Sequence, residues 1–424
     1  MSTIEKHDMT QGKILLPLVS FTIPLVLGNL FQLTYNAADS VIVGKYVGEQ
    51  ALAAVGTSTP IMNIAILLIS GMCMGASVLM SSQYGAKDYD TLSRQISTTM
   101  LAGCGFSVVF SLLMLLLANP VLRLIRVPET AIPEAAAYLR IIFMGLIFTF
   151  MYNFLANTMR ALGDSKTPLY FLVTSAFLNI FGDLFFVVVL RWGVAGSAIA
   201  TVCSEGLCCL LCGIYIKKKI PLLCLGKKWW VFDKSLLGKT VSYGSTSAMQ
   251  QVCLQLGKLI IQSVVNTQGV AVMAAFTAVN RVDDFAYTPQ QNIGHAMTTF
   301  LAQNKGAGHK ERMKKGFQTG LLIELVYSIG LFCVIWGLAP QIMTLFAEDG
   351  DAQVVSLGIS YLHLISWMYI LPGLTNGVQG FFRGIGDLKV TLYSTFMNMF
   401  GRVVAVFVTV SYTHLRAHET AANL

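Results

Sequence analysis

A segment of about ten residues occurs twice in this chain, once in each half. Residues 160–170 (RALGDSKTPLY) return as residues 383–393 (RGIGDLKVTLY), an offset of about 223 positions. Further echoes keep nearly the same offset, since residues 48–54 resemble 269–275 and residues 83–86 (QYGA) resemble 303–307 (QNKGA). The repeat spans most of the sequence, which predicts two similar halves.

The composition excludes a soluble globule, because 55% of the residues are hydrophobic and only 12% are charged. Apolar segments of roughly 20 residues or more recur along the chain, and each can cross about 30 Å of hydrocarbon as a helix. Period-two alternation, which a barrel would need, is absent. We therefore predict an all-α polytopic membrane protein. Its eleven predicted spans are 14–44, 51–82, 95–119, 134–160, 167–190, 193–216, 240–266, 270–300, 316–338, 353–382 and 390–410.

The 29 Lys and Arg residues are concentrated in alternate loops. The positive-inside rule places those loops, and the N-terminus, in the cytoplasm of a multi-pass protein of the inner (plasma) membrane. Such a distribution reflects membrane topology, so no nucleic-acid partner is expected. Because the repeated Gly-Asp-x-Lys loop is basic in both copies, the halves are predicted to be parallel. A pseudo-two-fold axis along the membrane normal then relates two six-helix lobes.

The expected domains are an N-terminal lobe (1–216), a cytoplasmic linker (217–239) and a C-terminal lobe (240–410). The repeat predicts a sixth helix in the second lobe, yet after residue 410 the sequence becomes polar (SYTHLRAHETAANL). Residues 411–424 resemble the translated read-through of a sequencing adapter joined to a truncated gene. A real polar tail on an eleven-helix protein is the alternative. We expect the first, because an odd helix count would break the pseudosymmetry.

Few polar groups lie inside the predicted spans of the first lobe. Asp39 is near the outer end of the first span, and Asn179 and Asp183 are four residues apart, so they share a helix face. Counted along the helices at about 1.5 Å per residue, Asp183 and Thr201 both lie some 12 Å below the turn at Trp192. These oxygen-bearing groups are therefore expected to converge at one level.

Two carboxylates in one low-dielectric pocket cannot both stay ionised at low cost. The pocket is therefore expected to take up a proton or to bind Na⁺ through the oxygens of Asp39, Asn179, Asp183 and Thr201. A hydrogen-bonded cluster that only fixes packing is the alternative. Pro24, which leaves the Ser20 carbonyl without its helical partner, is a candidate hinge in the first span, and an ordinary tolerated kink is equally compatible with it.

The second lobe does not copy this site, because Arg402 stands where the repeat would place the carboxylate of Asp183. Arg281 with Asp283 or Asp284 is expected to form an ion pair in preference to contacting substrate. The residues that could line a polar cavity are Asn153, Gln251, Gln255, Arg281 and Asp284.

The order of these motifs resembles the multidrug and toxic compound extrusion (MATE) family. The motifs are DSVIVG at 39–44, ALAAVG at 51–56, QYGA at 83–86, the Arg160 loop, GSAIAT at 196–201 and QNKGA at 303–307. The resemblance covers about residues 10 to 410 and implies twelve helices in two lobes. In the DNA-damage-inducible-F-like branch, to which it is most similar, it implies that Asp39, Asn179, Asp183 and Thr201 form the ion site.

What the resemblance implies is export of organic, often cationic, compounds by alternating access, driven by H⁺ or Na⁺. Small organic cations or amphiphiles and the lipid bilayer are the expected partners of a monomeric protein. A flippase for lipid-linked glycans of the same superfamily is the alternative, but its cavity should be cationic. No enzyme activity and no cofactor other than the coupling ion are expected. Cys203, Cys208, Cys209 and Cys212 on one apolar helix suit packing better than a tetrahedral metal site.

Overall fold

Helices make up nearly all of the chain that the computed structural model describes, which comprises residues 8–125, 127–220, 231–346 and 352–422. No strand occurs in these ranges. The helices of the first half are α1 (Leu15–Tyr46), α2 (Glu49–Gly85), α3 (Tyr89–Leu124), α4 (Ile132–Met144), α5 (Leu146–Ala161), α6 (Lys166–Asp183), the π-helix η2 (Leu184–Val189) and α7 (Gly193–Lys219). The second half holds α8 (Lys234–Val265), α9 (Val270–Gly306), α10 (Lys310–Phe346), α11 (Ala352–Ser366), the 3₁₀ turn η6 (Trp367–Tyr369), α12 (Ile370–Gly384) and α13 (Leu388–Ala422).

Each predicted span coincides with one helix or one interrupted helix. Among the described residues, eight helices are long and apolar enough to cross a membrane, or nine if α4 and α5, which meet at a 47° bend, form one span. Helices α8 and α9 are as long but more polar. The last helix continues to Ala422 and does not end at residue 410, whereas residues 221–230 of the predicted linker and 423–424 of the predicted tail lie outside the described residues.

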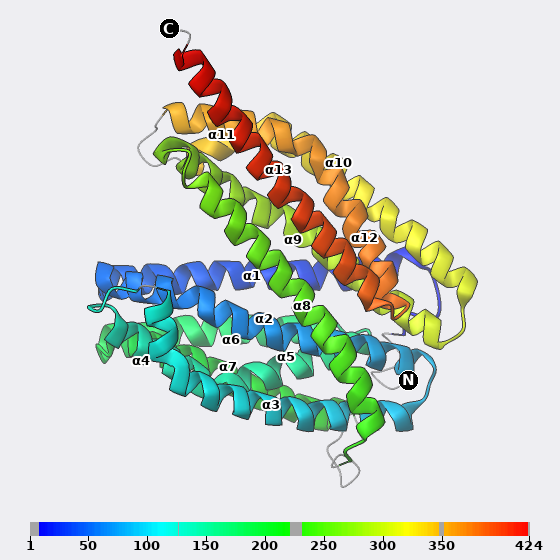
Figure 1. Ribbon diagram of the computed structural model, residues 1–424. Coiled ribbons are helices and arrows are strands. Elements are labelled where there is room, and N and C mark those ends of the chain that lie inside the picture. Colours follow the sequence, from blue (N-terminus) through cyan, green and yellow to red (C-terminus); the bar gives the residue numbers. More distant parts are fainter. Residues whose placement is uncertain (1–7, 126, 221–230, 347–351, 423–424) are drawn as a thin grey trace.

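The prediction of an all-helical, two-lobed protein is confirmed. Helices α1 to α7 form one lobe, and α8 to α13 form the other (Figure 1). The first lobe has an apolar core between α2, α3, α4, α5 and α7, which includes Phe143, Phe150 and Phe154. A second core joins α9, α10 and α11, and a third packs α1 of the first lobe against α9 of the second.

The lobes approach most closely at the end that carries the basic loops after α2 and α9. A methyl group on Gly85 would overlap the Gln303 carbonyl oxygen, and one on Gly306 would overlap that of Ser82. These glycines are the counterparts in the repeated segments 83–86 and 303–307, so the two copies meet each other. Only residues without a side chain allow backbones so close. Toward the other end the lobes diverge (Figure 1).

Hydrogen bonds reinforce this contact, which we call the basic-end seal. The Gln303 amide donates to the Ala161 carbonyl at 2.8 Å and accepts from the Met9 backbone N–H at 3.1 Å. Asn304 Nδ2 donates to the Met9 carbonyl at 3.2 Å, and Gln95 Nε2 donates to Thr240 Oγ1. Gln303 and Asn304 are fully buried. The repeated segments 83–86 and 303–307 therefore close the space between the lobes at this end.

Arg312, at the start of α10, holds the segment that precedes α1. Its guanidinium donates to the carbonyl oxygens of Met9, Gln11 and Gly12 at 2.7–3.3 Å. Arg312→Ala should therefore release this segment, and amide hydrogen exchange at Met9 and its neighbours should accelerate by roughly tenfold, because hydrogen bonds to a charged, part-exposed group are each modest. Lys314→Ala, which removes an exposed cation of the same helix, is the control. Equal exchange in all three proteins would contradict this role of Arg312.

Candidate functional site

The structure brings together the four first-lobe residues that the sequence singled out. The Ser197 hydroxyl donates to Asp39 Oδ1 at 2.6 Å, and Asn179 Nδ2 donates to Thr201 Oγ1 at 3.2 Å. Asp183 and Asn179 are buried on α6, with 0% and 3% of their surfaces exposed. Asp39, from α1, is partly buried. We call this group the lobe-1 acidic pocket.

The two carboxyl groups lie close enough for one to donate a hydrogen bond to the other when it is protonated. Among the described residues, neither oxygen of Asp183 has a donor, and Asn179 Oδ1 also lacks one. Unpaired buried acceptors are costly, and a proton or a cation would satisfy them. The hard oxygens of Asp39, Asp183, Asn179 and Thr201 are the ligand type that suits an alkali ion, so the residues present fit either H⁺ or Na⁺.

Local backbone geometry places Asp183 in this pocket. The α-helical part of α6 ends at Asp183, and the next six residues wind as the π-helix η2. Single π-helical turns inside α-helices are frequent at functional sites. Small residues then bring α7 close, because a methyl group on Gly182 would contact Ala200 Cβ at 3.0 Å and one on Gly196 would lie 3.0 Å from the Phe186 carbonyl oxygen. No sequence pattern predicted η2.

Glu205 on α7 is a third first-lobe carboxylate, which sequence reasoning missed. It accepts a hydrogen bond from Thr149 Oγ1 at 2.5 Å and lies within electrostatic range of Tyr35 and Tyr138, two phenols that also face Asp39. The sequence alone could have identified Glu205, because an ionisable residue inside a predicted membrane span such as 193–216 is costly and usually has a functional role. Glu205 therefore adds a third acidic group to the first lobe, between the middle of α7 and the start of α5.

Glu324, in the predicted span 316–338, was also missed. It is fully buried on α10, and neither of its oxygens has a hydrogen-bond donor. Gln290, Ser328 and Glu324 converge beside Gly373, where a methyl group would lie 2.8–3.3 Å from all three side chains. No cation pairs with Glu324 among the described residues, so its buried carboxylate has neither a hydrogen-bond donor nor a counter-ion there.

The predicted polar residues of the cavity do not form one group. Gln251 lines a small polar pocket at the lobe interface, but Gln255 and Arg281 are exposed. Asn153 donates to the Thr149 carbonyl one turn earlier in its own helix. The expected pairing of Arg281 with Asp283 or Asp284 was wrong, because Asp284 pairs with Lys258 of α8 at 3.2 Å. Arg281 and Asp284 are three residues apart on α9, a spacing that allows an ion pair, but the exposed Arg281 makes none among the described residues.

Pro24 lies within α1, which is one continuous helix from Leu15 to Tyr46. The helix carries Asp39 near one end, while Leu18, Phe21 and Leu25 pack against Ile293, Met297 and Phe300 of α9 near the other. A single helix therefore connects the lobe-1 acidic pocket with the contact between the lobes. The proposed hinge at Pro24 stays a prediction.

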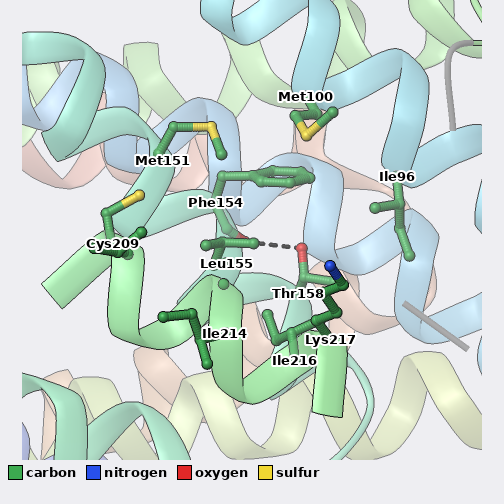
Figure 2. Close-up of a pocket in the computed structure, with 12 residues that line it drawn as sticks. Ile96, Met100, Met151, Phe154, Leu155, Thr158, Cys209, Ile214, Ile216 and Lys217 are labelled. Carbon is green, nitrogen blue, oxygen red and sulfur yellow. Dashed lines mark hydrogen bonds between the residues drawn. The ribbon is translucent and has the colours of Figure 1, made fainter. Parts of the chain in front are cut away.

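A separate cavity of ≈ 340 Å³ lies between α3, α5 and α7. Figure 2 shows Ile96 and Met100 on one side, Met151 and Phe154 of α5 in the middle, and Cys209 and Ile214 on the other. Among the described residues that line it, the polar groups are the Thr158 hydroxyl, which bonds to the Phe154 carbonyl of its own helix, and Lys217. The lining holds no carboxylate that could bind a coupling cation.

Two parallel helical lobes with buried carboxylates define a two-lobed membrane transporter. The MatE family matches residues 24–185 and 247–408, once in each lobe. The probable multidrug resistance protein YpnP of Bacillus subtilis (strain 168) is 32% identical over 392 residues, covering 92% of this chain and 86% of the relative. YoeA of the same organism, also a probable multidrug resistance protein, is 29% identical over 405 residues (93% and 87%). The chain belongs to the MatE family, that is, to the MATE transporters.

Solved structures show the same fold. A transporter of the MOP superfamily from Pyrococcus furiosus Vc1 (DSM3638) superposes with a TM-score of 0.89 at 23% identity, covering 97% of this chain and 92% of the other. An outward-facing multidrug resistance MATE transporter gives a TM-score of 0.89 at 22% identity, with the same coverage. At these identities the likeness concerns the fold.

Proposed function

We propose that this protein is a cation-coupled antiporter that exports organic, often cationic, compounds by alternating access. The observation that carries the proposal is the lobe-1 acidic pocket, where Asp39 and Asp183 face each other and the oxygens of Asp183 have no donor. Occupation by H⁺ or Na⁺ removes the repulsion between the carboxylates, so the ion changes the stability of whichever conformation holds them together. The names of YpnP and YoeA support a multidrug substrate range.

The mechanism uses α1 as the connecting element. In the structure the lobes meet at the basic end, which the positive-inside rule assigns to the cytoplasm, and diverge at the other. An ion entering from outside binds at Asp39 and Asp183 and shifts α1, with Pro24 as the flexible point. Substrate is released outward, and the shift is transmitted through Leu18, Phe21 and Leu25 to α9. Opening of the basic-end seal then exposes the cavity to the cytoplasm.

We assign the protein to the inner (plasma) membrane, as a monomer with its N-terminus in the cytoplasm. A flippase for lipid-linked glycans, the alternative function, needs a cationic path for a pyrophosphate group. The three carboxylates Asp39, Asp183 and Glu205 make the first lobe acidic, which disfavours that function.

Reconstitution into proteoliposomes tests the proposal. An imposed proton gradient and an imposed sodium gradient are applied separately, and uptake of a fluorescent organic cation is followed with the membrane potential clamped. Accumulation against the concentration gradient is expected under one of the two ions. At one ion per substrate, a tenfold ion gradient supports about tenfold accumulation, since each factor of ten is worth about 1.4 kcal/mol. Passive equilibration under both gradients would exclude an antiporter.

A further inference from the structure

The repeated arginines, Arg160 and Arg383, take no part in the ion site, and each is the first residue of its copy of the duplicated segment. Arg383 is 5% exposed near the end of α12, and its guanidinium lines the small polar pocket already noted for Gln251. The walls of this pocket come from α2 of the first lobe and from α8, α9 and α12 of the second. It therefore lies at the junction of the lobes. We call it the lobe-2 cationic pocket.

The charge of Arg383 is not balanced within the described residues. No carboxylate oxygen lies within 4.0 Å of its guanidinium or of that of Arg160. Arg383 Nη1 lies 3.1 Å from Nδ1 of His295 and 4.0 Å from the sulfur of Met74, neither of which is an anion, and its Nε–H has no acceptor among the described residues. The Nε–H of Arg160 also lacks one, and both guanidinium groups lie within electrostatic range of His295. Arginine stays charged in proteins, so burial without a counter-ion is costly.

The neighbouring amides add to the excess of donors. Asn376, 4% exposed and one of the residues lining the pocket, has an unpaired Nδ2 group, while its Oδ1 accepts from the Tyr287 hydroxyl at 3.4 Å. Gln250 and Gln379 bond to each other and to Thr395, which fixes that wall. The unpaired polar atoms of Arg383 and Asn376 are thus all donors. In the lobe-1 acidic pocket they are all acceptors.

We propose that the lobe-2 cationic pocket binds an oxyanion, a carboxylate or phosphate group carried by an amphiphilic molecule. Arg383 supplies the charge and Asn376 Nδ2 a second hydrogen bond. This deepens the proposed function, on which it rests, by assigning a subsite in the second lobe to an anionic group of the substrate. Because Met74 of α2 closes one side of the pocket, bound substrate contacts both lobes.

A matched pair of probes tests the proposal with the full chain in detergent. A xanthene dye with a free carboxylate and its methyl ester are titrated separately, and binding is followed by fluorescence anisotropy. Arg383→Met should weaken binding of the acid by about tenfold to a hundredfold, the usual range for a hydrogen bond to a charged group, and leave binding of the ester unchanged. Asn376→Asp, which keeps the size and adds a negative charge, should produce the same selective loss. Arg402→Met removes an exposed arginine of α13 outside the pocket and is the control.

Equal losses of binding affinity for the acid and the ester in both variants, or no loss for either dye, would overturn the oxyanion site. If Arg383→Met does not fold, Asn376→Asp decides alone. Short-chain phosphatidylglycerol as a competitor identifies the source. Displacement that depends on Arg383 extends the site to lipid phosphates, and lack of displacement restricts it to carboxylates of soluble amphiphiles. Because binding is measured without an ion gradient, failure of the antiport proposal leaves this result interpretable.

Discussion

Export driven by an ion gradient is expected to stop when Asp183 is changed to asparagine. Asparagine keeps the size of the side chain, but it cannot take up a proton and it contributes no charge to hold a cation. Asp183 is fully buried, and its two oxygens have no donor among the described residues, so its replacement removes one of the two carboxylates that would hold the ion. At one ion per substrate, a tenfold ion gradient supplies about 1.4 kcal/mol, which corresponds to about tenfold accumulation of substrate. In Asp183→Asn we expect no accumulation, so that the substrate concentrations on the two sides of the membrane become equal.

The measurement is substrate accumulation in proteoliposomes under the gradient that drives the wild type. Asp39→Asn should have the same effect, although its side chain keeps one bond, from Ser197. Asp90→Asn, which changes an exposed carboxylate in the first turn of α3, is the matched control and should export normally. Undiminished accumulation in both pocket variants would mean that Asp39, Asn179, Asp183 and Thr201 form a hydrogen-bonded cluster that only fixes packing. Equilibrium binding of substrate to each variant distinguishes lost coupling from a misfolded protein.

Alanine at Gly85 or Gly306 is expected to shift the protein away from the state in which the basic-end seal is closed. In an ordinary helix, glycine to alanine stabilises by about 1 kcal/mol. Here the added methyl group overlaps a backbone carbonyl of the other lobe, which cannot move like a flexible side chain. The steric cost therefore exceeds the gain in helix propensity. Because the two glycines contact opposite sides of the same seal, either substitution should suffice.

Distances between spin labels on the two lobes report the shift. Labels near residues 87 and 309 should move apart by several ångströms, and substrate export should slow by at least about tenfold, since one closed state is lost from the cycle. Gly330→Ala, on α10 where a methyl group meets nothing within 4 Å, is the control and should leave both measurements unchanged. Unaltered distances in Gly85→Ala and Gly306→Ala would show that the seal has room to relax.

Much of the fold was predictable, because the length of an apolar segment is enough to show that it can cross the membrane as a helix. All eleven predicted spans correspond to helices, but the contact between the repeated segments at Gly85 and Gly306 was not predicted, because a sequence repeat does not say how its copies pack. The convergence of Asp39 with Asp183 followed from counting helical rise. Glu205 and Glu324 were missed because each was taken as part of an apolar span. The pairing of Asp284 with Lys258 could not be foreseen, because it depends on how α8 and α9 are rotated about their axes.

The mutual contact of Gly85 and Gly306 has the form of an isologous interface, in which the same patch of two equal subunits meets itself. A single-lobe ancestor with this segment could pair with a second copy as a parallel homodimer before gene fusion. Each substitution there would have acted on both sides of the contact at once. After fusion the two copies became independent everywhere else, and one half could specialise in accepting protons or cations while the other specialised in donating hydrogen bonds.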